Sequence, residues 1–164
     1  MRIGIGYDSH RFAPGRRLVL AGVDVPFALG LAGHSDADAV AHAVTDALLG
    51  AAALGDIGTH FPPGEERWRD ADSLDLLRRA RALVAAQGWT VANVDVTVVC
   101  EAPRLAPYIP AMRERLAGSL EVPLSGVSIK GKTNEMMGWI GRGEGIAAMA
   151  VALLQAAGGP APAP

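Results

Sequence analysis

The segment from Ile3 to His10 constrains the fold most, because its apolar residues alternate with small ones. Ile3, Ile5 and Tyr7 recur at a period of two, which is the signature of a β-strand with two different faces. We expect the strand to continue through Asp8 and His10. The same alternation places a carboxylate and an imidazole on one face, where both can reach a single point.

The rest of the chain alternates between strand-like and helix-like segments. At 164 residues, it fits one domain that can bury its own core. Alternation predicts strands at 17–27, 91–98 and 127–130, and capping residues with apolar periodicity predict helices at 36–53, 73–88 and 107–120. Ser35 or Asp36 is expected to cap the first helix, and Asp72 or Ser73 the second.

The last apolar run, from Ile146 to Ala157, is ambiguous. It has no polar face, so periodicity does not separate a buried strand from a buried helix, and helix propensity favours a helix. Beyond it, residues 158–164 contain only Gly, Pro and Ala, a composition typical of a flexible tail. We therefore expect a domain at 1–157 and a tail at 158–164.

Composition argues against several classes of function. Half of the residues are hydrophobic, but each apolar run is interrupted before it could cross a bilayer. The start of the chain has no signal peptide pattern, so we expect a cytoplasmic protein with no membrane partner. The net charge of −2 provides no basic field for nucleic acid. The single cysteine, Cys100, excludes an internal disulfide, and its apolar surroundings predict no catalytic role.

A stripe of three polar residues marks the first predicted helix. Asp38, His42 and Asp46 follow one another at four-residue spacing among Ala, Val and Leu, and such residues are rare in a buried face unless they are paired or bind a metal. His42 joining Asp8 and His10 would give two imidazoles and one carboxylate. This set leaves a fourth tetrahedral position open, as in catalytic zinc sites, and Asp46 is placed to orient His42. Each fragment alone is also typical of an ordinary surface pair.

A second cluster combines cations, a carboxylate and glycines. Lys130, Lys132 and Thr133 supply donors to phosphate oxygens, Glu135 could hold a cation such as magnesium, and nearby glycines allow close backbone approach. The spacing of a Walker loop is absent. An ordinary Gly-rich loop with solvated charges is the alternative.

Several long motifs, taken together, resemble one enzyme family. The motifs are GYDSHRF at 6–12, GHSDAD at 33–38, His42, TDALLGAAALGDIG at 45–58 and GRGEGI at 141–146. In this order they are similar to the 2-C-methyl-D-erythritol 2,4-cyclodiphosphate synthases. The resemblance covers nearly the whole chain up to about Gln155.

The resemblance implies an α+β fold with a mixed β-sheet and helices packed on one face. It also implies a homotrimer whose sheets face the central axis, active sites between subunits, and a strand for the last apolar run. The implied enzyme is a metal-dependent phosphorus–oxygen lyase of the non-mevalonate pathway of isoprenoid synthesis. In the implied reaction, the 2-phosphate of 4-diphosphocytidyl-2-C-methyl-D-erythritol 2-phosphate attacks the β-phosphate, which gives the cyclic diphosphate and CMP.

The roles of individual residues are likewise implied by the resemblance. Asp8, His10 and His42 match zinc ligands, and Glu135 matches a ligand of a second cation, Mg²⁺ or Mn²⁺. His34 and Thr133 match groups that stabilise the transition state. The implied substrate-binding residues are Ser35, Asp56, Ile57, Gly58, Phe61, Lys132, Trp139 and Arg142. The implied cytidine-binding run is Cys100, Glu101, Ala102, Pro103, Arg104, Leu105 and Ala106.

Two departures and two alternatives stay open. Pro63-Gly64-Glu65-Glu66 replaces an Asp-rich turn of many relatives, and Trp139 replaces the more usual Phe. The first alternative function is a zinc-dependent phosphodiesterase that activates water with the same ligands. The second is a non-catalytic trimer that binds an isoprenoid diphosphate in its axial cavity through Arg142.

Overall fold

A mixed β-sheet of five strands forms the body of the computed structural model, which describes residues 1–158. The strand order is β4-β1-β7-β5-β6. The β5–β6 pair is parallel, and the β1–β4, β1–β7 and β5–β7 pairs are antiparallel. The strands are β1 (Arg2–Ala13), β4 (Gly30–Leu31), β5 (Trp89–Val99), β6 (Val127–Lys132) and β7 (Gly145–Ala156).

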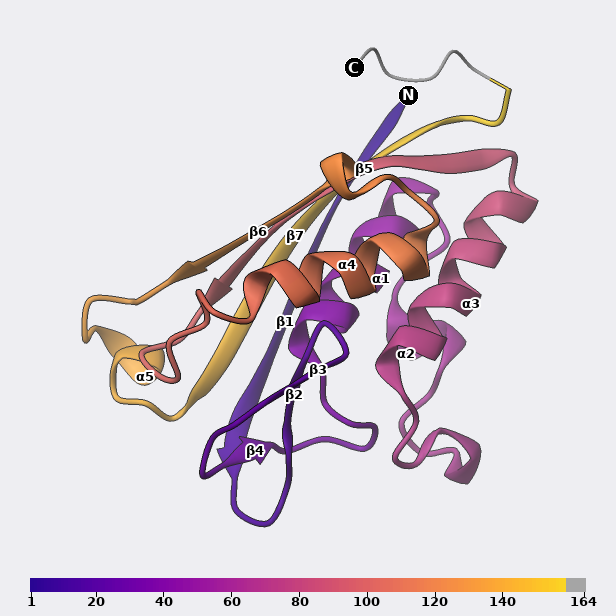
Figure 1. The fold of residues 1–164 in the computed structure, drawn as a ribbon. Coiled ribbons are helices and arrows are strands. Elements are labelled where there is room, and N and C mark those ends of the chain that lie inside the picture. The colour runs from indigo at the N-terminus through magenta and orange to yellow at the C-terminus, as the bar shows by residue number, and fades with distance from the viewer. Residues whose placement is uncertain (159–164) are drawn as a thin grey trace.

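The longer helices cover one face of this sheet, as Figure 1 shows. They are α1 (Ala39–Ala51), α3 (Ser73–Ala86) and α4 (Ile109–Leu120). Shorter elements are α2 (Ile57–His60), α5 (Gly138–Gly141) and the 3₁₀ turns η1 (Glu66–Trp68) and η2 (Leu124–Gly126). The predicted α+β fold, with a mixed sheet and helices on one face, is therefore confirmed.

The prediction of a helix for the last apolar run is wrong, whereas the strand implied by the resemblance is confirmed. This segment forms β7, which lies between β1 and β5. Ala148, Ala150 and Ala152 face the helices and are fully buried, while Met149 and Val151 on the opposite face are exposed. Packing of the small residues under the helices outweighs the intrinsic helix preference of alanine and leucine.

Close packing of α1 on β1 depends on two glycines of the first strand. A Cβ on Gly4 would lie 2.1 Å from the carbonyl oxygen of Ala47, and one on Gly6 would lie 1.9 Å from that of Ala43. A side chain at either position would push the helix off the sheet. Because Asp8 lies on the same face of β1 as these glycines, the helix passes directly beside it.

The first helix begins at Ala39, later than predicted, and its cap is Asp38 rather than Ser35 or Asp36. The Asp38 side chain accepts hydrogen bonds from the backbone N–H groups of Val40 and Ala41 (both 3.0 Å). It also accepts from two backbone N–H groups, at 2.8 and 2.7 Å, in the turn between β2 (Leu18–Leu20) and β3 (Val23–Val25). The fully buried Asp38 therefore joins this hairpin to the helix.

The second and third helices lie close to their predicted positions. Asp72 caps α3 through a 2.8 Å hydrogen bond to the N–H of Leu74, and the predicted strand at 17–27 is the β2–β3 hairpin. No helix within residues 1–158 is both long and apolar enough to cross a bilayer. Of the predicted tail at 158–164, residues 159–164 lie outside the described part of the chain.

Candidate metal centre

Three side chains from β1 and α1 converge as predicted. The Asp8 Oδ2 atom lies 2.8 Å from His10 Nε2 and 3.1 Å from His42 Nδ1, and the two ring nitrogens are 3.3 Å apart. Two ligands each about 2.0 Å from a tetrahedral zinc ion lie about 3.3 Å from one another. The three atoms thus form a triangle of the size that one zinc ion requires. Within residues 1–158, no other cluster of His, Cys, Asp or Glu has this arrangement.

The other nitrogen of each imidazole has its own hydrogen-bond partner. His10 Nδ1 lies 2.7 Å from the carbonyl oxygen of Ala32, to which it donates. His42 Nε2 lies 2.9 Å from Ser73 Oγ and 3.2 Å from Ser35 Oγ. These contacts leave His10 Nε2 and His42 Nδ1 facing Asp8, with which they share hydrogen bonds. A cation that replaced those protons would take the lone pairs of both nitrogens, which is the usual arrangement around metal-binding histidines.

The electrostatics of the cluster keep Asp8 ionised. Burial acts to raise the pKa of the Asp8 carboxyl, but hydrogen bonds and charge from His10 and His42 outweigh it and hold the pKa well below its usual range. Burial acts to lower the pKa of His10, and the contact with Asp8 reverses this and raises it. A carboxylate with two imidazoles is a donor set that suits zinc, so the residues present fit the predicted metal.

The predicted stripe of Asp38, His42 and Asp46 divides into three separate roles. Asp38 is the helix cap described above. Asp46 Oδ1 accepts a 2.7 Å hydrogen bond from the backbone N–H of Ile57. Among the described residues, Asp46 makes no hydrogen bond to His42, whose Nε2 instead contacts Ser35 and Ser73. Four-residue spacing alone did not distinguish these roles.

A cavity of 190 Å³ adjoins the candidate ligands. It brings His34 and Ser35 together with Ile57, Gly58 and Phe61, all of which the resemblance placed at the substrate. Its wall also includes Pro63, from the segment that departs from the pattern of many relatives, and two residues that sequence reasoning missed: Trp68 and Leu76.

The sides of this cavity are held by loop contacts. His34 Nε2 lies 3.1 Å from the carbonyl oxygen of Glu65, which joins the segment before α1 to the loop after Phe61. Asp56 does not line the cavity. It caps α2 by accepting hydrogen bonds of 2.8 Å from both the N–H and the hydroxyl of Thr59.

Lys132 and Thr133 of the second cluster line a separate pocket of 300 Å³ at the ends of β5 and β6, whereas Lys130 pairs with Asp95, and Glu135 is not in the wall. The pocket shares no lining residue with the cavity at the metal ligands. Of the predicted cytidine-binding run, only Ala102 is missing from its wall. The residues that line it are Cys100, Glu101, Pro103, Arg104, Leu105, Ala106, Ile109, Gly131, Lys132 and Thr133.

Glu101 organises the turn after this pocket. Its Oε1 atom accepts hydrogen bonds from the backbone N–H groups of Asn134 (2.9 Å) and Met136 (3.1 Å). Between them lies Glu135, whose carboxylate accepts a 3.0 Å hydrogen bond from the Thr133 hydroxyl. Glu135 and Met136 have φ angles of 50° and 61°, a region that costs energy for residues other than glycine. The carboxylate of Glu101 holds the turn in this conformation.

Two further predicted substrate residues lie near this turn. Trp139 is half-buried and packs against Val99, Ile140 and Ala147. Arg142 is exposed, and its Nε donates to Glu144 Oε1 at 2.6 Å. The structure brings neither side chain into the cavity at the metal ligands.

Comparison with known proteins gives concordant results. A protein from Symbiobacterium thermophilum named 2-C-methyl-D-erythritol 2,4-cyclodiphosphate synthase is 60% identical over 154 residues, or 94% of this chain and 98% of that one. A solved structure of a synthase of this name with CDP bound matches with a TM-score of 0.87 at 39% identity, covering 94% of this chain and 100% of the other.

A bifunctional IspDF protein of Campylobacter jejuni matches with a TM-score of 0.91 at 38% identity, and the match covers 94% of this chain but 42% of that longer one. The model of the YgbB family matches residues 1–155. The chain therefore belongs to the YgbB family, whose curated relatives are named 2-C-methyl-D-erythritol 2,4-cyclodiphosphate synthases.

Proposed function

We propose that this protein converts 4-diphosphocytidyl-2-C-methyl-D-erythritol 2-phosphate to 2-C-methyl-D-erythritol 2,4-cyclodiphosphate and CMP. The 2-phosphate oxygen forms a bond to the β-phosphorus, and the bond from that phosphorus to the oxygen of the CMP group breaks. The attacking group is already an anion, so the protein needs to align the phosphates and neutralise charge rather than provide a strong base. The convergence of Asp8, His10 and His42 beside a cavity carries this proposal.

We assign a zinc ion to the three converging side chains. The triangle of ligand atoms has the right size, and the three donors leave one position for a substrate oxygen. When bound there, the ion would polarise the β-phosphate as a Lewis acid. Asp8 compensates part of its charge, and the hydrogen bonds to the other ring nitrogens keep the two imidazoles in place.

The cavity next to the ligands is proposed to take the methylerythritol part of the substrate. Its wall combines apolar Ile57 and Phe61 with His34 and Ser35. His34 lies on the side of the cavity next to the loop after Phe61, where its Nε2 donates to the carbonyl oxygen of Glu65. It would donate to a phosphate oxygen by exchanging this partner, or through Nδ1 as the imidazolium. The apolar wall limits the access of water, which favours attack by the substrate's own phosphate over hydrolysis.

The second pocket is proposed to bind the cytidine and the α-phosphate. Arg104 and Lys132 supply donors to phosphate. The Thr133 hydroxyl donates to Glu135, whose carboxylate is placed to hold a Mg²⁺ or Mn²⁺ ion. When bound, this second ion would neutralise charge on the departing CMP. The CDP in a similar solved structure supports a nucleotide site in this chain.

Assembly as a homotrimer would bring the two pockets together from neighbouring subunits. The sheet face opposite the helices carries Ile3, Ile5 and Tyr7 of β1, which are 73%, 73% and 54% exposed, beside exposed Met149 and Val151 of β7. An apolar patch of this kind is typical of a surface that meets other protein. We propose that further copies of this chain cover it.

One phosphorus NMR experiment tests the reaction. The protein is incubated with the diphosphocytidyl substrate, Zn²⁺ and Mg²⁺, and we expect the signals of CMP and a cyclic diphosphate to appear together. His42→Ala should remove both signals, while Leu83→Asp on the exposed surface of α3 should keep them. A linear diphosphate that carries solvent oxygen would instead indicate a phosphodiesterase. If CMP never forms, the proposal fails.

A further inference from the structure

The contact between His42 and Ser73 continues to a third residue. The hydroxyl of Ser73 donates a hydrogen bond to Asp36 Oδ1, and the backbone N–H of Ser73 donates to Asp36 Oδ2 at 3.1 Å. A hydroxyl has one proton to donate. Because the carboxylate can only accept, the proton of Ser73 points to Asp36, and the lone pairs of Ser73 Oγ face His42 Nε2 at 2.9 Å.

When a cation takes the place of a proton between Nδ1 and Asp8, this direction of hydrogen bonding favours one tautomer of His42. The Ser35 hydroxyl also lies 3.2 Å from Nε2 and has lone pairs that can accept from it. A lone pair on Ser73 Oγ stabilises a proton on Nε2, and a neutral imidazole with a proton on Nε2 has its free lone pair on Nδ1. Nδ1 is the atom that lies 3.1 Å from Asp8 Oδ2 and 3.3 Å from His10 Nε2. The sequence of contacts from Asp36 through Ser73 thus presents the correct nitrogen of His42 to the cation.

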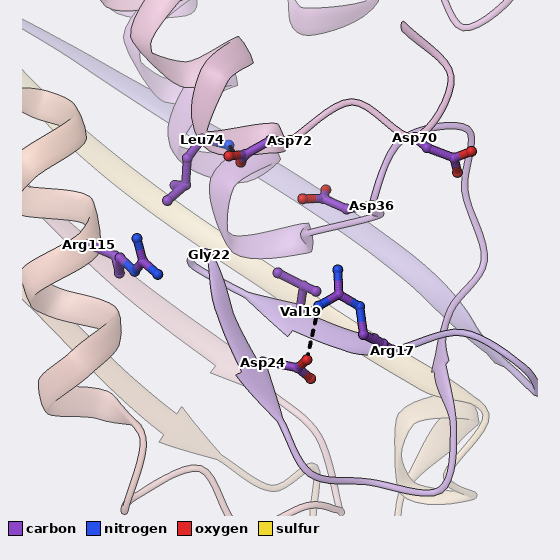
Figure 2. Close-up of a pocket in the computed structure, with 9 residues that line it drawn as sticks. All are labelled: Arg17, Val19, Gly22, Asp24, Asp36, Asp70, Asp72, Leu74 and Arg115. Carbon is purple, nitrogen blue, oxygen red and sulfur yellow. Dashed lines mark hydrogen bonds and ion pairs between the residues drawn. The ribbon is translucent and has the colours of Figure 1, made fainter.

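Asp36 is more exposed than the serine that it contacts. It lies in the wall of a cavity of 360 Å³, together with Arg17, Asp70 and Asp72. Figure 2 shows its carboxylate in this wall. The side chain is half-buried rather than enclosed, so solvent can reach the residue. Ser73, in contrast, is fully buried, and its hydroxyl has no access to water as an alternative partner.

We propose that Asp36, acting through Ser73, is a positioning residue of the metal centre that holds His42 in the Nε2–H tautomer. The inference rests on the proposed metal site. It gives a role in metal binding to two residues 37 positions apart that the sequence motifs did not connect with the metal. Without the carboxylate, the Ser73 hydroxyl is free to turn and donate to Nε2, which favours the tautomer that cannot bind through Nδ1.

Zinc affinity of the full-length protein provides the first test, measured by competition with a chromophoric chelator. We expect Ser73→Ala and Asp36→Ala each to weaken zinc binding by about 10- to 100-fold. Because Asp36 acts through Ser73, the double variant should bind no more weakly than Ser73→Ala alone. Ser119→Ala, which removes an equally buried hydroxyl in α4, is the matched control and should keep the wild-type affinity. Asp36→Asn, which keeps one acceptor oxygen, replaces Asp36→Ala if the latter does not fold.

The second test is spectroscopic and reports which nitrogen of His42 carries the proton. A purely structural role of Asp36 and Ser73 would leave this signal unchanged. In a long-range ¹H–¹⁵N spectrum of the zinc-loaded protein, we expect the proton of His42 on Nε2 and zinc on Nδ1, with an Nε2–H signal that shifts and exchanges faster in Ser73→Ala. Wild-type zinc affinity in folded Ser73→Ala, or a proton on Nδ1 in the wild type, would overturn the inference while leaving the proposed reaction intact. If the wild type binds no zinc, both the inference and the metal assignment fail.

Discussion

Replacing Gly6 with alanine should separate β1 from α1 and open the metal centre. The added Cβ would lie 1.9 Å from the carbonyl oxygen of Ala43 and 2.7 Å from the backbone nitrogen of Ala47. Ordinary van der Waals contact begins at 3.4 Å, so the carbonyl must move by about 1.5 Å, the difference between these two distances. Both atoms belong to the helix backbone, and therefore no side chain can absorb the change.

The movement is large compared with the tolerance of a metal site. His42 precedes Ala43 on the helix, so its ring moves with the carbonyl, whereas zinc–ligand distances tolerate changes of only about 0.2 Å. We expect zinc affinity to fall by about 100-fold or more. Overpacking of this kind typically costs about 1–3 kcal/mol of stability, and we expect a value toward the upper end because the backbone must shift.

The assay pairs urea denaturation with zinc competition on two variants. Gly118→Ala is the matched control, because a Cβ at this exposed position in α4 meets nothing within 4 Å. There the same substitution should leave zinc binding unchanged and add up to about 1 kcal/mol of stability through helix propensity. A folded Gly6→Ala protein with wild-type stability and zinc affinity would refute the reasoning.

Three further predictions concern the second pocket and the exposed sheet face. Burial and the negative charge of Glu101 raise the pKa of Cys100 to about 11 from the ordinary 9.0, so alkylation of the native thiol by iodoacetamide should keep accelerating up to about pH 11. A native rate that levels off near pH 9, as expected for the unfolded chain, would contradict this. Glu101→Ala should raise the Mn²⁺ concentration needed for half-maximal CMP release, with zinc content unchanged, whereas Glu101→Gln, which keeps an acceptor oxygen, should resemble the wild type. Equal Mn²⁺ requirements in all three proteins would show that Glu101 does not organise Glu135. Ile5→Asp should convert a trimer to smaller species in light scattering, while Leu83→Asp on α3 should not, and an unchanged mass for Ile5→Asp would argue against the apolar face as the interface.

The geometry of the metal ligands could be predicted because it depends on local periodicity. Residues two positions apart on a strand share a face, and this rule predicted that Asp8 lies beside His10. The contribution of His42 required only that one helix pack on that strand. The close approach that makes the contact is explained by Gly4 and Gly6, whose role appears once the helix is seen against them.

Other features depended on contacts between segments distant in sequence. Four-residue spacing suggested that Asp38 and Asp46 share the site with His42. The sequence does not fix the residue at which the helix begins, so a cap such as Asp38 could not be distinguished from a residue on the helix face. Ser73 meets His42 across 31 positions, and nothing local marks it beyond a helix N-terminus. β7 was assigned to the wrong element by propensity, because its neighbours in the sheet rather than its own sequence determine its conformation.

Anomalous diffraction at the zinc edge, from crystals of the protein purified without chelators, tests the central claim most directly. The account predicts one strong peak per chain, about 2.0–2.2 Å from Asp8 Oδ2, His10 Nε2 and His42 Nδ1. A well-ordered site with no peak, or a zinc ion bound by other residues while these three pair only with one another, would contradict it.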